Sequence, residues 1–67
     1  MIQLRHERIA RGWSLEYVAS KIGVTKTAIH DIETGKRLGS IKVWDALEDL
    51  FGENQRTLRK QINKKEN

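Results

Sequence analysis

Five glycines punctuate a chain that contains no proline, and their spacing limits the fold more than any other feature. Glycine is the usual residue just past the C-terminal end of a helix, because that position often takes a left-handed backbone conformation. The glycines are Gly12, Gly23, Gly35, Gly39 and Gly52. As stop signals, they predict helices over residues 2–11, 14–22, 25–34 and 40–51, with a weaker helix over 54–64. The sequence therefore predicts an all-α fold, a compact bundle of about five short helices.

Residues at the predicted helix starts support the same boundaries. Side chains that accept a hydrogen bond from a free backbone N–H are preferred immediately before a helix. Such residues precede four of the segments: Ser14, Thr25, Ser40 and Asn54.

The second and third predicted helices are short and amphipathic. At about 100° per residue, apolar side chains gather on one face of each helix. They are Leu15, Val18, Ala19 and Ile22 on the second helix, and Ala28, Ile29 and Ile32 on the third. Only Gly23 and Val24 separate the second helix from the cap of the third. Because two helices joined by a short glycine turn form a helix-turn-helix, we predict this motif over about residues 14–34.

The polar face of the third predicted helix is a candidate surface for DNA. It presents Lys26, Thr27, His30 and Asp31. Their donors and acceptors suit base edges in the major groove, and Lys36 and Arg37 follow where they could hold the phosphate backbone. A solvated helix face shows the same pattern, and glycine turns also join helices in proteins that do not bind DNA. The spacing alone leaves both interpretations open.

Charge is distributed unevenly along the chain. The 13 Lys and Arg residues outnumber the 9 Asp and Glu residues, and the isoelectric point of about 9.8 is compatible with nucleic-acid binding. Basic residues concentrate in residues 5–11, 36–42 and 56–65, whereas residues 45–53 contain four acids and no Lys or Arg. We therefore expect one surface, rather than the whole molecule, to attract phosphates.

Nothing in the sequence points to catalytic, metal or cofactor chemistry. There is no cysteine, and His6 and His30 stand far apart without the spacing of metal ligands. No nucleophile with its base and no glycine-rich phosphate loop is recognisable. We expect a protein that is not an enzyme and that takes no cofactor, metal ion or small-molecule ligand.

Length and hydropathy define the class of protein. A chain of 67 residues forms one domain, which we assign to residues 1–67. Early charged residues and the lack of a long apolar run argue against a signal peptide and a membrane span, so we expect a cytoplasmic protein. Because a core of this size is marginal, a partner subunit is the expected source of further stability.

Residues 4–14, LRHERIARGWS, resemble the opening of Cro- and phage-repressor-type (Xre-like) helix-turn-helix regulators. Those domains begin with a basic first helix, a glycine, an apolar residue and a capping serine. The resemblance continues in order and spacing through VA at 18–19, IGVT at 22–25, Ile29, IE at 32–33, GKR at 35–37, Ser40 and LFG at 50–52. It covers about residues 2–52 and implies a lambda-repressor-like domain that binds an operator-like site on double-stranded DNA.

The resemblance also implies roles for particular residues. The positions that match DNA contacts in the family are Ser14, Thr25, Lys26, Thr27, His30, Asp31, Lys36, Arg37 and Ser40. Arg8 and Glu33 match a pair that joins the first helix to the third, so a structural ion pair is expected. The implied function is transcriptional regulation, and we expect a repressor because a bound dimer blocks polymerase without further surface.

Three residues depart from the family pattern. Leu15 stands where many members have a glutamine beside the DNA backbone, and its periodicity indicates packing instead. Gly39 replaces a proline that often precedes the capping serine, which predicts a looser loop. Glu7 occupies a position that is often apolar, and we expect it to face solvent.

The fourth predicted helix carries a wide apolar arc. Its members are Val43, Trp44, Ala46, Leu47, Leu50 and Phe51. They span roughly 160°, whereas packing on one core needs about 100°. Either the small core needs both aromatic residues inside, or part of the arc meets a second copy.

Helix-turn-helix proteins commonly bind as two-fold dimers, so we expect a homodimer. The interface candidates are Val43, Trp44, Leu47, Leu50 and Phe51. The alternative function, a protein-binding module such as an antitoxin or antirepressor, would use the same apolar face of residues 43–51.

The basic region over residues 54–67 forms a C-terminal helix or tail. Leu58 and Ile62 are its only apolar pair at helical spacing. The region either docks through these two side chains, toward DNA or toward the acidic fourth helix, or stays solvated.

Overall fold

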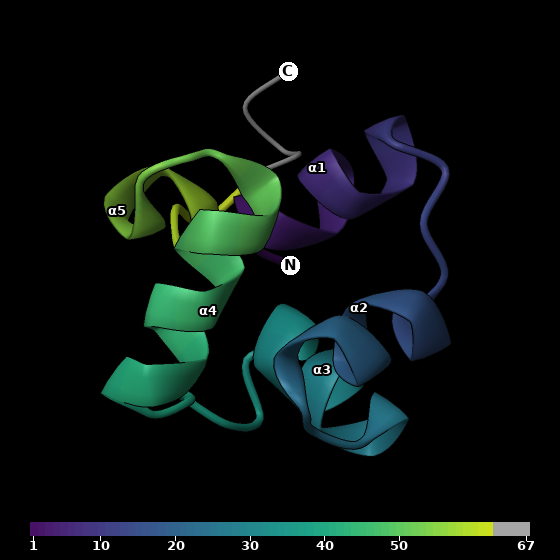
Figure 1. Cartoon of the computed structure of the whole chain (residues 1–67). Coiled ribbons are helices and arrows are strands. Elements are labelled where there is room, and N and C mark those ends of the chain that lie inside the picture. The colour runs from purple at the N-terminus through teal and green to yellow at the C-terminus, as the bar shows by residue number, and fades with distance from the viewer. Residues whose placement is uncertain (63–67) are drawn as a thin grey trace.

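Five helices form in the part of the chain that the computed structural model describes, residues 1–62 (Figure 1). They are α1 (Gln3–Ala10), α2 (Leu15–Ile22), α3 (Lys26–Thr34), α4 (Ile41–Phe51) and α5 (Gln55–Leu58). The predicted all-α fold of five short helices is confirmed. Within these residues, no helix has the length and apolar content needed to cross a membrane.

Side chains close the N-terminal ends of α2, α3 and α4 at the predicted positions. Ser14 Oγ accepts a hydrogen bond from the Tyr17 N–H at 2.9 Å, and Thr25 Oγ1 accepts one from the Ala28 N–H at 3.1 Å. Ser40 caps α4 in the same way. Each of these helices ends at a glycine with a left-handed backbone, a conformation that is costly for other residues. Local signals therefore account for these helix boundaries.

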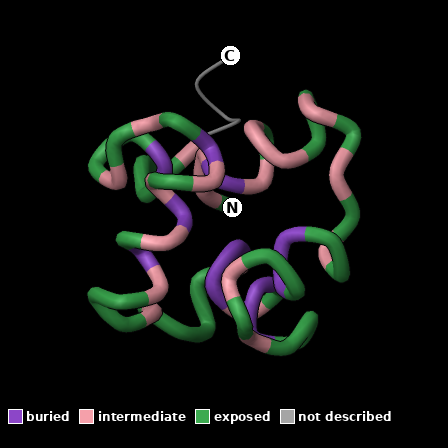
Figure 2. Tube along the Cα trace, viewed as in Figure 1, coloured by how far each residue is buried: buried purple, intermediate pink, exposed green. Residues whose placement is uncertain are grey.

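All five helices contribute to one core (Figure 2). Its buried members are Leu4, Val18, Ala19, Ile29, Ile32, Trp44, Leu47, Phe51 and Leu58. In Figure 1, α4 runs down one side of the molecule, α2 and α3 lie toward the bottom, and α1 and α5 lie toward the top. Leu15, which departs from the family pattern, is half-buried and packs against this core.

The wide apolar arc of α4 serves this core. Trp44, Leu47 and Phe51 are at most 5% exposed, and Val43 and Leu50 are half-buried against the core. Three of the five interface candidates are therefore enclosed by the chain's own helices. The small domain needs both aromatic side chains inside, which is the first of the two explanations that the sequence left open.

The loop between α3 and α4 is tight, so the looser loop predicted from Gly39 was wrong. The Trp44 indole Nε1–H donates to the Leu38 carbonyl oxygen at 2.7 Å. Gly39 has a φ of +82°, and a Cβ built there would lie 2.8 Å from Trp44 Nε1 and 3.2 Å from Ile32 Cδ1. The absence of a side chain at Gly39 lets the indole close against the loop backbone.

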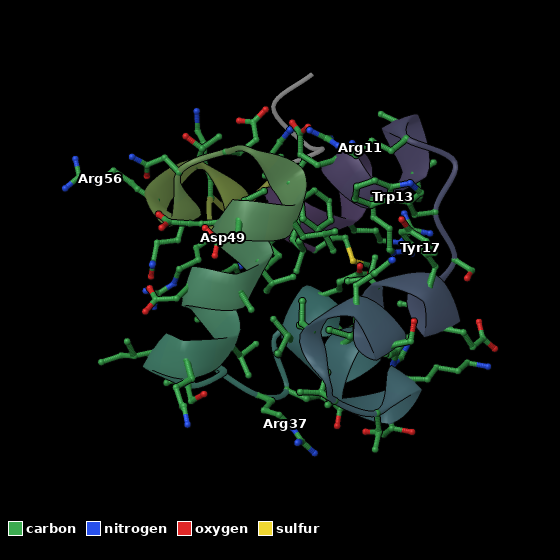
Figure 3. The ribbon with its side chains drawn as sticks, in the orientation of Figure 1. Arg11, Trp13, Tyr17, Arg37, Asp49 and Arg56 are labelled. Atoms are coloured by element: carbon green, nitrogen blue, oxygen red, sulfur yellow. The ribbon has the colours of Figure 1, made fainter. Side chains whose placement is uncertain are left out.

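Glu7 does not simply face solvent, contrary to the prediction. Its side chain is 21% exposed and accepts hydrogen bonds from Arg11 Nη1 at 2.7 Å and from Gln3 Nε2 at 2.8 Å. These two hydrogen bonds, that of Arg11 first, lower the pKa of Glu7. Arg11 also donates to the Phe51 carbonyl oxygen at 2.9 Å, and Figure 3 shows it near Trp13. Glu7 therefore helps to orient an arginine that joins α1 to the end of α4.

The helix α5 is a single turn and is shorter than the helix predicted over residues 54–64. It ends at Leu58, whose side chain is fully buried. Residues 59–62 are not helical, so the predicted end was wrong. The remainder of the basic tail, residues 63–67, lies outside the described residues.

After α5 the chain runs beside its own first residues. Backbone hydrogen bonds and an antiparallel bridge join the two segments: the Gln3 N–H to Lys60 O at 2.8 Å, the Ile62 N–H to Met1 O at 3.0 Å, and Ile2 opposite Gln61. This pairing holds the backbone extended and explains why the helix does not continue. Residues 54–62 are therefore docked and not solvated, but through Leu58 and this backbone pairing, not through the predicted Leu58 and Ile62 pair.

Candidate nucleic-acid interface

The turn between α2 and α3 sets the direction of α3. Gly23 ends α2 with a φ of +78°, and the half-buried Val24 packs against the core. On α3, Ala28, Ile29 and Ile32 turn inward and are at most 8% exposed. Because these contacts fix one face of α3, its opposite face is left open to solvent or to a ligand.

Four side chains of this helix were predicted to contact DNA bases, and three of them lie on that open face. Lys26, Thr27 and His30 are exposed. Asp31 differs, because only 19% of its side chain is exposed and its Oδ1 lies 3.9 Å from His30 Nδ1. The fold therefore brings an ammonium group, a hydroxyl and an imidazole to one side of α3.

Asp31 holds the loop that follows α3. Its carbonyl oxygen accepts hydrogen bonds from the Lys36 N–H at 2.8 Å and from the Arg37 N–H at 3.2 Å. Its carboxylate Oδ2 accepts a further one from Arg37 Nη2 at 3.3 Å. Sequence reasoning considered only a base contact for Asp31 and missed this anchoring of the loop.

The loop presents cations beside the open face of α3. Lys36 and Arg37 are exposed, and so are Ser40 and the nearby Lys42. In Figure 3, Arg37 points away from the body of the molecule below α3. The Ser40 hydroxyl accepts the capping hydrogen bond of α4, which leaves its own O–H free to donate to another acceptor.

Two large apolar side chains beside this loop were missed by sequence reasoning. Leu38 is 79% exposed and Ile41 is 78% exposed. Neither residue belongs to the apolar arc of residues 43–51, and this position outside the arc is the signal that could have identified them as exposed. Leu38 belongs to the loop itself, and Ile41 is the first residue of α4.

The N-terminal end of α2, where the resemblance placed a backbone contact at Ser14, also carries an acid. Ser14 is exposed, and Glu16 Oε2 lies 3.3 Å from Lys26 Nζ. A hydrogen bond from its own backbone N–H, followed by the hydrogen bond and charge of Lys26, lowers the pKa of Glu16. Sequence reasoning missed this pair because it links two helices and depends on how they cross.

An ion pair between Arg8 and Glu33 joins α1 to α3. Arg8 Nε donates to Glu33 Oε2 at 2.7 Å, and the two side chains are 11% and 2% exposed. Arg8 Nη1 also donates to the Trp13 carbonyl oxygen at 2.8 Å. Arg8 is therefore part of the scaffold that holds α3, and it lies away from the open face.

The open face has no arrangement suited to a metal. Among residues 1–62, no three His, Asp or Glu side chains lie close enough together to hold an ion.

Several curated proteins are similar to most of this chain. One from Saccharolobus islandicus and one from Saccharolobus solfataricus are each 41% identical to it over 51 residues, and one from Halorubrum lacusprofundi is 44% identical over 50 residues. All three are named as candidate HTH-type transcriptional regulatory proteins. The similarity covers 76% or 75% of this chain but only 16% or 15% of those proteins.

No solved structure matches the chain. A sequence model described as a helix-turn-helix domain matches residues 2–61. This range includes all five helices, the turn before α3, the open face and the basic loop. The chain therefore belongs to the helix-turn-helix domain family.

Proposed function

We propose that this chain is a transcriptional regulator that binds double-stranded DNA in a sequence-specific manner and reads the major groove with α3. The observation that carries the proposal is the division of α3 into two faces. One face is packed in the core, while the open face with Lys26, Thr27 and His30 leads into the basic loop at Lys36 and Arg37.

The side chains on the open face suit base edges. Lys26 can donate to guanine O6 or N7, and the Thr27 methyl can pack on the methyl group of thymine. His30 can donate to a base acceptor or to a phosphate. Asp31 could accept from cytosine N4, but its bond to Arg37 makes loop anchoring its main contribution.

The phosphate contacts would come from the loop and the helix starts. Lys36 and Arg37 supply charge, and Ser14, Thr25 and Ser40 stand at helix N-terminal ends, where hydroxyls and free N–H groups favour anions. Such contacts position a protein on DNA without reading its sequence. Together they surround the reading residues of α3.

We further propose that the protein acts as a homodimer and as a repressor in the cytoplasm, bound to an operator-like site. Names given to similar proteins support a regulatory role. Because Trp44, Leu47 and Phe51 are enclosed, the proposed dimer contact shifts to Leu38 and Ile41. The same burial removes much of the face that the alternative, an antitoxin-like or antirepressor-like module, was expected to use.

Selection of binding sites from a random duplex library tests the proposal. We expect one sequence motif to be enriched and binding to weaken as salt rises, because phosphate contacts release counterions. Lys36→Gln should weaken binding to all sequences alike and lower the salt slope by about 0.9. His30→Ala should change the base selected at one position instead.

Arg56→Gln is the matched control for lost charge. Arg56 is exposed on α5 and projects to the left in Figure 3, away from α3, so its loss should leave the salt slope unchanged. The absence of an enriched motif, or binding that does not respond to salt, would contradict sequence-specific recognition of DNA.

A further inference from the structure

Glu16 has contacts that resemble those of a DNA phosphate. Its carboxylate belongs to the first turn of α2, where backbone N–H groups lack helical partners, and its Oε2 lies 3.3 Å from Lys26 Nζ. A backbone phosphate bound to a helix-turn-helix domain would draw on the same two donors, a free helix N–H and a lysine. The acid is therefore placed where it competes with phosphate.

We propose that Glu16 acts as an internal phosphate mimic, which occupies Lys26 in the free protein and so weakens binding to DNA of arbitrary sequence. This inference rests on the proposed DNA-binding function. It assigns a specificity-determining role to a residue outside the base-reading set.

The effect on specificity follows from which contacts each kind of DNA offers. Binding to arbitrary sequence depends almost entirely on phosphate contacts. Its affinity therefore falls most when Lys26 is already paired with Glu16. At a cognate site Lys26 can gain a base acceptor as well, which compensates for leaving Glu16. The Glu16 carboxylate therefore lowers the affinity for non-cognate DNA more than the affinity for the cognate site.

Arg37 is held in a comparable way. Its Nη2 donates to Asp31 Oδ2 at 3.3 Å. The two pairs differ in burial, because the Glu16 side chain is 66% exposed and that of Asp31 is 19% exposed. Glu16 is free to move away when DNA arrives, whereas Asp31 also fixes the loop backbone, so Glu16 is the better test.

A mutant cycle in the full chain tests the proposal, with a random-sequence duplex as the probe and fluorescence anisotropy as the measurement. Glu16→Gln should tighten binding about two- to five-fold, the range of an exposed ion pair. It should also steepen the salt slope by about 0.9, because one more phosphate is neutralised. In a Lys26→Gln background, the same substitution should leave the slope unchanged.

Asp49→Asn is the matched control, because it removes one negative charge from an exposed position on α4 (Figure 3). It should not change the salt slope. An equal change of slope for Glu16→Gln with and without Lys26, or no change at all, would overturn the role of Glu16. If the wild type binds no duplex, it is the proposed function that fails. Thermal unfolding of each variant separates these outcomes from a loss of fold.

Discussion

Arg8 donates two hydrogen bonds to the carboxylate of Glu33, from Nε to Oε2 at 2.7 Å and from Nη2 to Oε1 at 3.2 Å. The pair links α1 to α3, and Glu33 is the only buried charged or polar residue of the described chain. The orientation of the open face of α3 therefore depends on a contact on the opposite side of that helix.

Glu33→Ala should lower the free energy of unfolding by about 3–5 kcal/mol, because it leaves the Arg8 guanidinium without its partner in a nearly buried place. Urea denaturation measures the loss. Arg8→Met/Glu33→Met should cost less than the sum of the two single changes, since no unpaired charge remains. A loss below about 1 kcal/mol for Glu33→Ala, a value typical of surface pairs, would contradict a structural role for the pair.

Gly39→Ala should destabilise the protein more than Gly12→Ala. Both glycines have a positive φ, +82° and +71°. In this left-handed conformation each alanine should lower the free energy of unfolding by about 1–2 kcal/mol. Only at residue 39 would the new Cβ also meet an indole, at 2.8 Å. Equal losses of unfolding free energy for the two variants would show that the loop accommodates a side chain and that the contact with Trp44 is not limiting.

Acid should remove the contribution of Glu7. Its pKa in the folded chain is lowered from 4.5, so the stabilisation is present above that value and is lost as the pH falls through the folded pKa. We expect the wild type to melt at a higher temperature than Glu7→Gln at pH 7, and the difference to shrink below about pH 4. A difference in melting temperature that is the same at both pH values would contradict this linkage.

Leu38→Ser/Ile41→Ser should shift the proposed dimer toward monomer and leave the fold of the single chain intact, because both side chains are in solvent in that chain. Sedimentation equilibrium at micromolar concentration gives the measurement. Ile9→Ser is the control, since Ile9 is 50% exposed on α1. A wild type that is monomeric both with and without DNA would contradict the dimer itself.

Local chemistry made most of the fold predictable. Helix ends depend on caps such as Ser14 and on glycines such as Gly23, whose effect does not need the rest of the chain. The inward faces of α2 and α3 followed from periodicity for the same reason. The open face of α3 was therefore predictable from the sequence alone.

Contacts between distant residues were the part that sequence could not supply. The pairing of Glu16 with Lys26 depends on the crossing of two helices, and the tightness at Gly39 depends on where Trp44 places its indole. The width of the apolar arc of α4 is visible in the sequence. Whether the chain's own core or a second copy covers the arc depends on how the helices pack.

The antiparallel bridge between Ile2 and Gln61 has a kinetic consequence. Bringing residues so far apart in sequence together costs a large loop-closure entropy. The pairing of residues 1–3 with residues 60–62 should therefore form late in folding and open early in native-state fluctuations. The Ile2 N–H also donates to the Glu33 carbonyl oxygen at 3.3 Å. Ile2 thus lies between the chain end and the last turn of α3, and hydrogen exchange at the Gln3 and Ile62 amides would report how often the pairing with residues 60–62 opens.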